Sequence, residues 1–206
     1  MIQLRITRWR KPSSARWLSR QLNDPYVAEA RRLGYRSRAA FKLIELDNRF
    51  RLLRPGQRVV DLGCAPGGWT QVAVARVGRY GIVVSVDVTE TTPLPGATLL
   101  TADIRDPATL AAIGNALGGP ADIVLSDMAP AATGHAATDH LRIVTLAEDA
   151  FAVASEILKP GGAFVAKVFQ GGAEGQLLAA LKRDFAELRH AKPPAPCRSR
   201  QYRQDH

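Results

Sequence analysis

Residues 58–70 read Arg-Val-Val-Asp-Leu-Gly-Cys-Ala-Pro-Gly-Gly-Trp-Thr, and the organisation of the whole chain is clearest from this stretch. It begins with a short apolar run, which is typical of a strand buried on both faces. A loop with Gly63, Gly67 and Gly68 follows, and residues 71–77 have the composition of a helix. Glycines let backbone N–H groups approach a ligand, and a helix N-terminus favours negative charge. The stretch therefore predicts a nucleotide-type cofactor site at the carboxyl end of a sheet strand.

The glycine spacing distinguishes between two kinds of cofactor. Dinucleotide-binding turns have the pattern G-x-G-x-x-G, whereas here Asp61 precedes glycines at positions 63, 67 and 68. This D-x-G-x-x-x-G-G arrangement resembles motif I of methyltransferases that use S-adenosylmethionine (SAM). The spacing disfavours a nicotinamide-dependent oxidoreductase. A tight turn that binds no ligand is the simpler structural alternative.

Composition places the chain among soluble globular proteins. Its 206 residues are 46% hydrophobic and 23% charged, which suits one domain with a real core. The apolar runs are too short to cross a bilayer, and the N-terminus lacks the apolar segment of a signal peptide. Two cysteines form neither a disulfide framework nor a metal site, and His135 and His140 lack partners for zinc. We expect a cytoplasmic protein without a membrane partner or a metal.

The positive charge is concentrated at the N-terminus. Residues 1–58 hold 15 Lys and Arg against 4 Asp and Glu, whereas residues 59–206 hold 13 against 15. Such a basic segment is typical of a nucleic-acid partner, although a solvated face kept for solubility is the alternative. Aromatic residues between the arginines suit looped RNA, unless they belong to the core. The candidate RNA contacts are Arg31, Arg32, Arg36 and Arg38, and the aromatic residues are Trp9, Trp17, Tyr26 and Tyr35.

Alternating strand and helix patterns predict one α/β domain with a mostly parallel sheet and helices on both faces. Strands are expected from residue 58 and at 82–87, 98–103, 122–127, 163–169 and 188–191. Helices are expected at 13–23, 25–33, 37–50, 71–77, 107–117, 139–158 and 176–185, with Asp24 and Ser37 as N-caps and Gly34 as a C′ residue. Within the single domain 1–206, residues 1–57 form a basic helical extension, 58–192 the core and 193–206 an irregular tail.

Four of the predicted strands end, or nearly end, in an aspartate, and the fifth contains a lysine in an apolar run. The residues are Asp61, Asp87, Asp103, Asp127 and Lys167. Ligands of open α/β sheets bind beyond the carboxyl ends of the strands, so these side chains are candidates for a site. A single terminal aspartate is more often a helix N-cap, and Asp103 could cap the helix that begins near residue 107.

Three further segments accompany the glycine loop in order. Residues 36–43 read Arg-Ser-Arg-Ala-Ala-Phe-Lys-Leu, 126–130 read Ser-Asp-Met-Ala-Pro, and 165–171 read Val-Ala-Lys-Val-Phe-Gln-Gly. With these motifs the chain resembles the FtsJ/RrmJ family of ribosomal RNA ribose 2′-O-methyltransferases, from about residue 17 to about residue 200. The resemblance implies a SAM-methyltransferase variant of the Rossmann fold and SAM as cofactor. It also implies a uridine ribose in large-subunit ribosomal RNA as substrate; we expect a monomer.

The resemblance also implies roles for individual residues. Gly67 and Trp69 match cofactor-binding positions of motif I, and Asp87 matches the acid that binds the cofactor's ribose hydroxyls. Asp103 matches a position near the adenine, and Asp127 one near the methionine part and the methyl group.

The family's catalytic set is Lys-Asp-Lys-Glu, and Lys42, Asp127 and Lys167 match its first three members. The chemistry needs alignment and a base, because a ribose hydroxyl is a poor nucleophile until its proton leaves. Lys167 is the expected base, and Asp127 is expected to hold its amine. Without the family match, Lys42 would be interpreted as an exposed helix residue. For Lys167 the alternative is an edge-strand charge kept for solubility, although an isolated lysine among Val, Ala and Phe residues is costly without a function.

The fourth catalytic position departs from the family pattern. The run Arg198-Ser-Arg leads to Gln201, so that no carboxylate stands where the family has Glu. The segment from Gln201 to His206 is too short and too polar to form the family's last strand, so we expect a shortened sheet edge. A catalytically weakened RNA-binding module of the same fold is therefore the alternative function.

Overall fold

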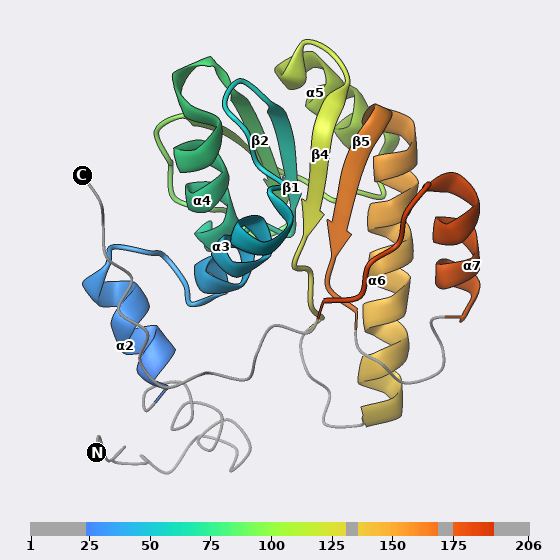
Figure 1. Cartoon of the computed structure of the whole chain (residues 1–206), viewed down its shortest axis with the longest axis horizontal. Coiled ribbons are helices and arrows are strands. Elements are labelled where there is room, and N and C mark those ends of the chain that lie inside the picture. Colours follow the sequence, from blue (N-terminus) through green and yellow to red (C-terminus); the bar gives the residue numbers. More distant parts are fainter. Residues whose placement is uncertain (1–23, 131–135, 169–174, 192–206) are drawn as a thin grey trace.

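The computed structural model describes residues 24–130, 136–168 and 175–191 (Figure 1). In this part of the chain five parallel strands form one sheet in the order β3-β2-β1-β4-β5. The strands are β1 (Arg58–Leu62), β2 (Ile82–Asp87), β3 (Ala97–Thr101), β4 (Ala121–Ser126) and β5 (Leu158–Ala166). The helices are α2 (Pro25–Arg32), α3 (Ala39–Phe50), α4 (Gly68–Val77), α5 (Pro107–Leu117), α6 (Ala136–Ile157) and α7 (Gly175–Asp184), with a 3₁₀ turn at Gly78–Tyr80. The predicted α/β class is confirmed.

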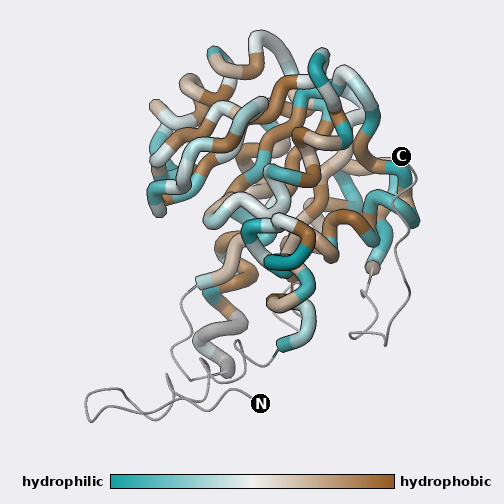
Figure 2. The backbone as a smooth tube through the Cα atoms, turned by 90° about the vertical axis from the view of Figure 1, so that its left-hand side faces the viewer, coloured by the Kyte–Doolittle hydropathy of each residue, from teal (hydrophilic) through white to brown (hydrophobic). Residues whose placement is uncertain are grey.

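The sheet lies between two helical layers (Figure 1). Neighbouring residues of β1 point to opposite faces: Val59 packs with α3 and α4, and Val60 packs with α5 and α6. Both valines are fully buried, as expected for a parallel sheet covered on both sides. Hydrophobic segments run mainly through the middle of the molecule, and hydrophilic segments lie mostly toward its outside (Figure 2). No helix in the described ranges is long and apolar enough to cross a membrane.

The strand order creates a crevice between β1 and β4. The chain proceeds from β1 outward to β2 and β3, then crosses over to β4 and β5 on the other side of β1. Loops that follow β1 and β4 therefore leave in opposite directions at this point, which is where open α/β sheets bind ligands. Gly63 follows β1 and Asp127 follows β4, so both lie at this edge.

The N-terminal helices confirm one predicted cap and correct another. Asp24 caps α2, because its Oδ1 accepts a hydrogen bond from Tyr26 N at 2.8 Å, and Gly34 has the positive φ of 75° expected of a C′ residue. Ser37 does not cap α3, whose N-cap position is occupied by Arg38 without a side-chain cap bond. The Ser37 hydroxyl is instead buried against Gly68, at the start of α4.

Other differences concern element boundaries. Helix α4 begins at Gly68, three residues earlier than predicted, and α6 begins at residue 136. Strand β5 begins at Leu158 rather than at residue 163. Its pairing with β4 changes register between Leu158 and Ala163, because residues 159–162 form a bulge. The predicted strand at 188–191 does not form, and those residues follow α7 without regular structure. The predicted helix at 13–23, the tail with Gln201 and the edge it was expected to shorten lie outside the described residues.

Candidate active site

A pocket of about 800 Å3 opens at the carboxyl edge of the sheet. Its walls come from the segments that follow β1, β2, β3 and β4, and from one side of α6. This volume falls in the range of small-molecule and cofactor sites. Of the predicted cofactor residues, Asp87, Asp103 and Asp127 line it, together with Gly63 of the glycine loop.

The glycine loop is held in a conformation that only glycine adopts readily. Gly67 is buried with a φ of 106°, and its N–H donates to Cys64 O at 2.6 Å. A Cβ on Gly67 would lie 3.0 Å from the Arg36 side chain. Trp69 points away from the pocket into the core under α3, where its Nε1 donates to Ala39 O at 2.8 Å. A cofactor contact by the Trp69 indole has no support in this geometry, and its role remains a prediction.

The Asp87 carboxylate is oriented by backbone donors. Its Oδ2 accepts from Ala65 N at 2.9 Å, and its Oδ1 accepts from Thr89 N at 2.8 Å. One donor belongs to the glycine loop and the other to the turn after β2, so the carboxylate joins the two segments. With both oxygens held, its free lone pairs can accept hydrogen bonds from ligand hydroxyls in the pocket.

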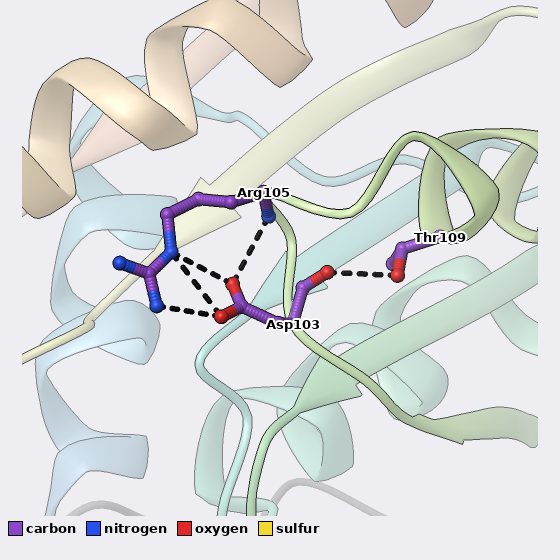
Figure 3. Close-up of polar contacts among 3 residues, drawn as sticks. All are labelled: Asp103, Arg105 and Thr109. Atoms are coloured by element: carbon purple, nitrogen blue, oxygen red, sulfur yellow. Dashed lines mark hydrogen bonds and ion pairs between the residues drawn. The ribbon is translucent and has the colours of Figure 1, made fainter.

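Asp103 is engaged by an arginine that sequence analysis did not identify (Figure 3). Arg105 Nε and Nη2 donate to both Asp103 oxygens, with the shortest distance 2.6 Å, and Arg105 N donates to Oδ1 at 3.0 Å. These hydrogen bonds lower the pKa of Asp103 to about 2. Asp103 is not the cap of α5, because Asp106 accepts from Ala108 N at 2.9 Å in that role.

The three predicted catalytic side chains converge. Lys167 Nζ lies 2.8 Å from Asp127 Oδ1 and donates to Asp127 O at 2.8 Å. Lys42 Nζ lies 3.5 Å from the same Oδ1, although 85 positions separate the two residues. Asp127 directly follows β4 and Lys167 directly follows β5, so both lie at the carboxyl edge of the sheet. Lys42 belongs to α3, in the helical layer beside the sheet. One carboxylate on the pocket wall thus holds two amines.

Asp61 is a fully buried carboxyl beneath the glycine loop. Thr70 Oγ1 donates to its Oδ2 at 2.7 Å and lies 3.1 Å from Ser85 Oγ, whereas Oδ1 has no hydrogen-bond partner in the described structure. Burial is the main cause that raises the pKa of Asp61 from 3.8 to about 7, and the nearby charges of Asp127 and Asp87 add to it. A carboxyl without full hydrogen bonding is costly to keep charged, so this group is poised near neutrality.

The four arginines predicted to contact RNA differ in their exposure and in their interaction partners. Arg31, Arg32 and Arg38 are exposed, with Arg32 paired to Glu29 and Arg38 to Asp24. Arg36 is half-buried, and its guanidinium donates to three backbone carbonyl oxygens.

Two of the aromatic residues proposed to suit RNA belong to the packing of the N-terminal helices. The rings of Tyr26 and Tyr35 both pack edge-on against Phe41, at centroid distances of 5.8 and 5.6 Å. Trp9 and Trp17 lie outside the described residues.

The described residues offer neither a reactive thiol nor a metal site. Cys64 is buried in the glycine loop, and desolvation raises the pKa of its thiol to about 12, so it is a packing residue rather than a reactive thiol. The residues that the structure describes contain no group of three His, Cys, Asp or Glu side chains able to hold a metal ion. His135 lies outside them.

The wall that α6 contributes to the pocket was not predicted from the sequence. It is formed by Thr138, Leu141, Arg142, Thr145, Leu146 and Asp149. Their spacing of three to four residues places them on one face of a helix, which was the available signal.

A family model matches most of the chain. The model for FtsJ-like methyltransferases matches residues 35–201. The chain belongs to the FtsJ-like methyltransferase family. This methyltransferase uses SAM as its cofactor, which confirms the expectation from the glycine spacing and excludes the nicotinamide alternative.

Its relatives carry consistent names. A protein of Paramagnetospirillum magneticum named ribosomal RNA large subunit methyltransferase E is 59% identical over 199 residues, which cover 94% of this chain and 82% of the relative. A protein of the same name from Rhodospirillum rubrum is 58% identical over 198 residues, covering 94% and 75%. A crystal structure from Plasmodium falciparum, assigned as a ribosomal RNA methyltransferase, superposes with a TM-score of 0.73 at 30% identity and covers 78% of this chain and 92% of that one.

Proposed function

We propose that this methyltransferase transfers the methyl group of SAM to a ribose 2′-hydroxyl, on a uridine, in large-subunit ribosomal RNA. The observation that carries the proposal is the convergence of Lys167 and Lys42 on Asp127 at the wall of the pocket. The names of the relatives supply the class of RNA. The cytoplasm as its location and a monomeric state belong to the same proposal.

The pocket residues fit SAM by their chemistry. Hydroxyl and ammonium groups need acceptors, and Asp87, Asp103 and Asp127 place three carboxylates along one pocket. Asp87 would hold the ribose hydroxyls, Asp103 would lie at the adenine end, and Asp127 would lie near the methionine part. Gly67 would act through the loop that it shapes: its φ of 106° turns the chain, and Gly63 and Ala65 of the same loop line the pocket. When bound, SAM supplies a methyl group on a sulfonium, which needs no metal for activation.

The lysine–aspartate cluster supplies alignment and a base. Lys167 Nζ would accept the proton of the ribose 2′-hydroxyl, and the methyl–sulfur bond of the sulfonium would break as the methyl group passes to that oxygen, so that an uncharged thioether leaves. Its position is set by two acceptors on the same residue, the carboxylate and the main-chain oxygen of Asp127. When Lys167 is neutral, Asp127 is still paired with the Lys42 cation, so neither charge is left alone. General base catalysis of this kind contributes about 10²–10⁴ in rate.

The catalytic proposal is tested by methyl transfer from labelled SAM to large-subunit ribosomal RNA. Lys167→Ala should lower the rate at least about 100-fold while SAM affinity stays within about twofold. Lys159→Ala is the matched control, because Lys159 pairs with Asp122 at the opposite end of the same two strands. Turnover retained by Lys167→Ala would remove Lys167 as the base.

The RNA proposal is tested by charge reversal on the exposed face of the N-terminal helices. Replacing Arg31, Arg32 and Arg38 with Glu should weaken RNA binding and reduce its dependence on salt, because each lost phosphate contact lowers the slope by about 0.7–0.9. Unchanged RNA binding would show that this face does not contact RNA. A catalytically weakened RNA-binding module would bind SAM and RNA without incorporating label.

A further inference from the structure

Arg36 is the one member of the predicted RNA-contact set whose guanidinium lies against main-chain carbonyls. Its Nη1 donates to Thr92 O at 2.7 Å and to Pro66 O at 3.4 Å, and its Nη2 donates to Pro93 O at 2.6 Å. The side chain is half-buried, unlike those of Arg31 and Arg38. A planar guanidinium suits this arrangement because its donors diverge toward several acceptors at once.

The three carbonyls belong to two different loops of the cofactor pocket. Pro66 is part of the glycine loop, and Thr92 and Pro93 belong to the segment after β2. That segment follows Asp87, the last residue of β2, and its Val88 and Thr89 line the pocket. The Asp87 carboxylate joins the two loops through Ala65 N. Arg36 forms a second link between them, from Pro66 O to Thr92 O and Pro93 O.

The backbone of Arg36 is itself anchored to the helix that follows the glycine loop. Arg36 N donates to Gln71 Oε1 at 2.7 Å, and Gln71 Nε2 donates to Gly34 O at 3.0 Å. The side chain also lies against Gly67, where an added Cβ would meet Arg36 Cδ and Nη1 at 3.0 Å. The position of the guanidinium is thus set by α4 on one side and by the glycine loop on the other.

We propose that Arg36 is a positioning residue for the cofactor, which holds the glycine loop and the loop after β2 at the separation that one SAM molecule requires. This inference rests on the proposed cofactor site between Gly67 and Asp87. It assigns to Arg36 a role different from a phosphate contact, because its donors are directed at Pro66, Thr92 and Pro93. Arg31 and Arg38 remain the candidates for RNA.

The test compares SAM binding and RNA binding in the same set of full-length variants. Arg36→Ala removes all three links, and Arg36→Lys keeps the charge but replaces the fork by a single ammonium. SAM dissociation constants are measured by calorimetry without RNA, and RNA binding is measured over a salt series. Arg31→Ala is the matched control, an exposed arginine of the preceding helix.

We expect Arg36→Ala to weaken SAM binding about tenfold, and Arg36→Lys about three- to tenfold, with the salt slope of RNA binding equal to that of the wild type. Arg31→Ala should show the reverse, unchanged SAM affinity and a shallower salt slope. Full SAM affinity in Arg36→Lys would show that a positive charge alone suffices at this position, and it would overturn the proposal.

Two further outcomes separate this inference from its alternatives. SAM affinity within twofold of wild type in both Arg36 variants, with a shallower salt slope, would make Arg36 an RNA contact. Lower thermal stability with unchanged SAM affinity would make its role merely structural and would equally overturn the inference. Wild-type protein that binds SAM but transfers no methyl group would instead contradict the proposed function, and the Arg36 comparison would still be decided by SAM affinity alone.

Discussion

Replacing Asp61 by Asn should change how the stability of the fold depends on pH. Asp61 is fully buried, one of its oxygens has no hydrogen-bond partner within residues 24–130, 136–168 and 175–191, and its pKa is raised from 3.8 to about 7. The native protein therefore holds this proton more tightly than the unfolded chain does. The contribution of the neutral carboxyl to stability is complete below about pH 4, falls as the pH rises through the interval to about 7, and is then lost.

The magnitude follows from the shift. The rise of the pKa from 3.8 to about 7 corresponds to about 4 kcal/mol of unfolding free energy over the full interval, of which about 2–3 kcal/mol falls between about pH 5 and about pH 8. Asparagine cannot ionise, and its side-chain oxygen can still accept from Thr70 Oγ1. Asp61→Asn should therefore flatten the pH dependence by about this amount and be the more stable protein at the higher pH.

The assay is urea unfolding of both proteins at a series of pH values, with equal m-values as the check on two-state behaviour. Ser85→Ala is the control, because it alters the neighbourhood of Thr70 while leaving the Asp61 carboxyl in place. It should keep the wild-type pH dependence. Parallel stability curves for the wild type and Asp61→Asn between about pH 5 and about pH 8 would refute the reasoning.

Three further predictions concern the pocket and its supporting elements. Arg105→Ala removes the side-chain donors to Asp103, so the pKa of Asp103 should rise toward its ordinary value, as measured by NMR titration; a pKa that stays near 2 would contradict this. Asp106→Ala removes the N-cap of α5 and should cost about 1 kcal/mol of unfolding free energy in urea titrations. Gly67→Ala combines a φ of 106° with a close approach to Arg36, and should cost about 1–3 kcal/mol and weaken SAM binding; wild-type values of both would contradict the need for glycine there.

The strands and most helices could be predicted because their signals are local. The apolar run at 82–87 became β2 with the predicted bounds, and the helix at 107–117 became α5. Predictions were wrong where tertiary packing competes with local signals. Ser37 has the chemistry of an N-cap, but its hydroxyl is buried beside Gly68 and has no hydrogen-bond partner among the described residues. The Pro-Gly-Gly turn at 160–162 was expected to precede β5, yet pairing with β4 takes it into the strand as a bulge.

The α/β class, the glycine loop after the first strand and the family can all be inferred from residue order, because they depend on periodicity, glycine positions and ordered motifs. Which side chains meet is known only from the folded chain. Lys42 contacts Asp127 across 85 positions, Arg36 contacts two loops, and one Asp61 oxygen has no partner in the part of the chain that the structure describes. The physical reason is that spacing along a chain sets local backbone geometry, whereas contacts between distant residues depend on the order and parallel register of the strands that carry them.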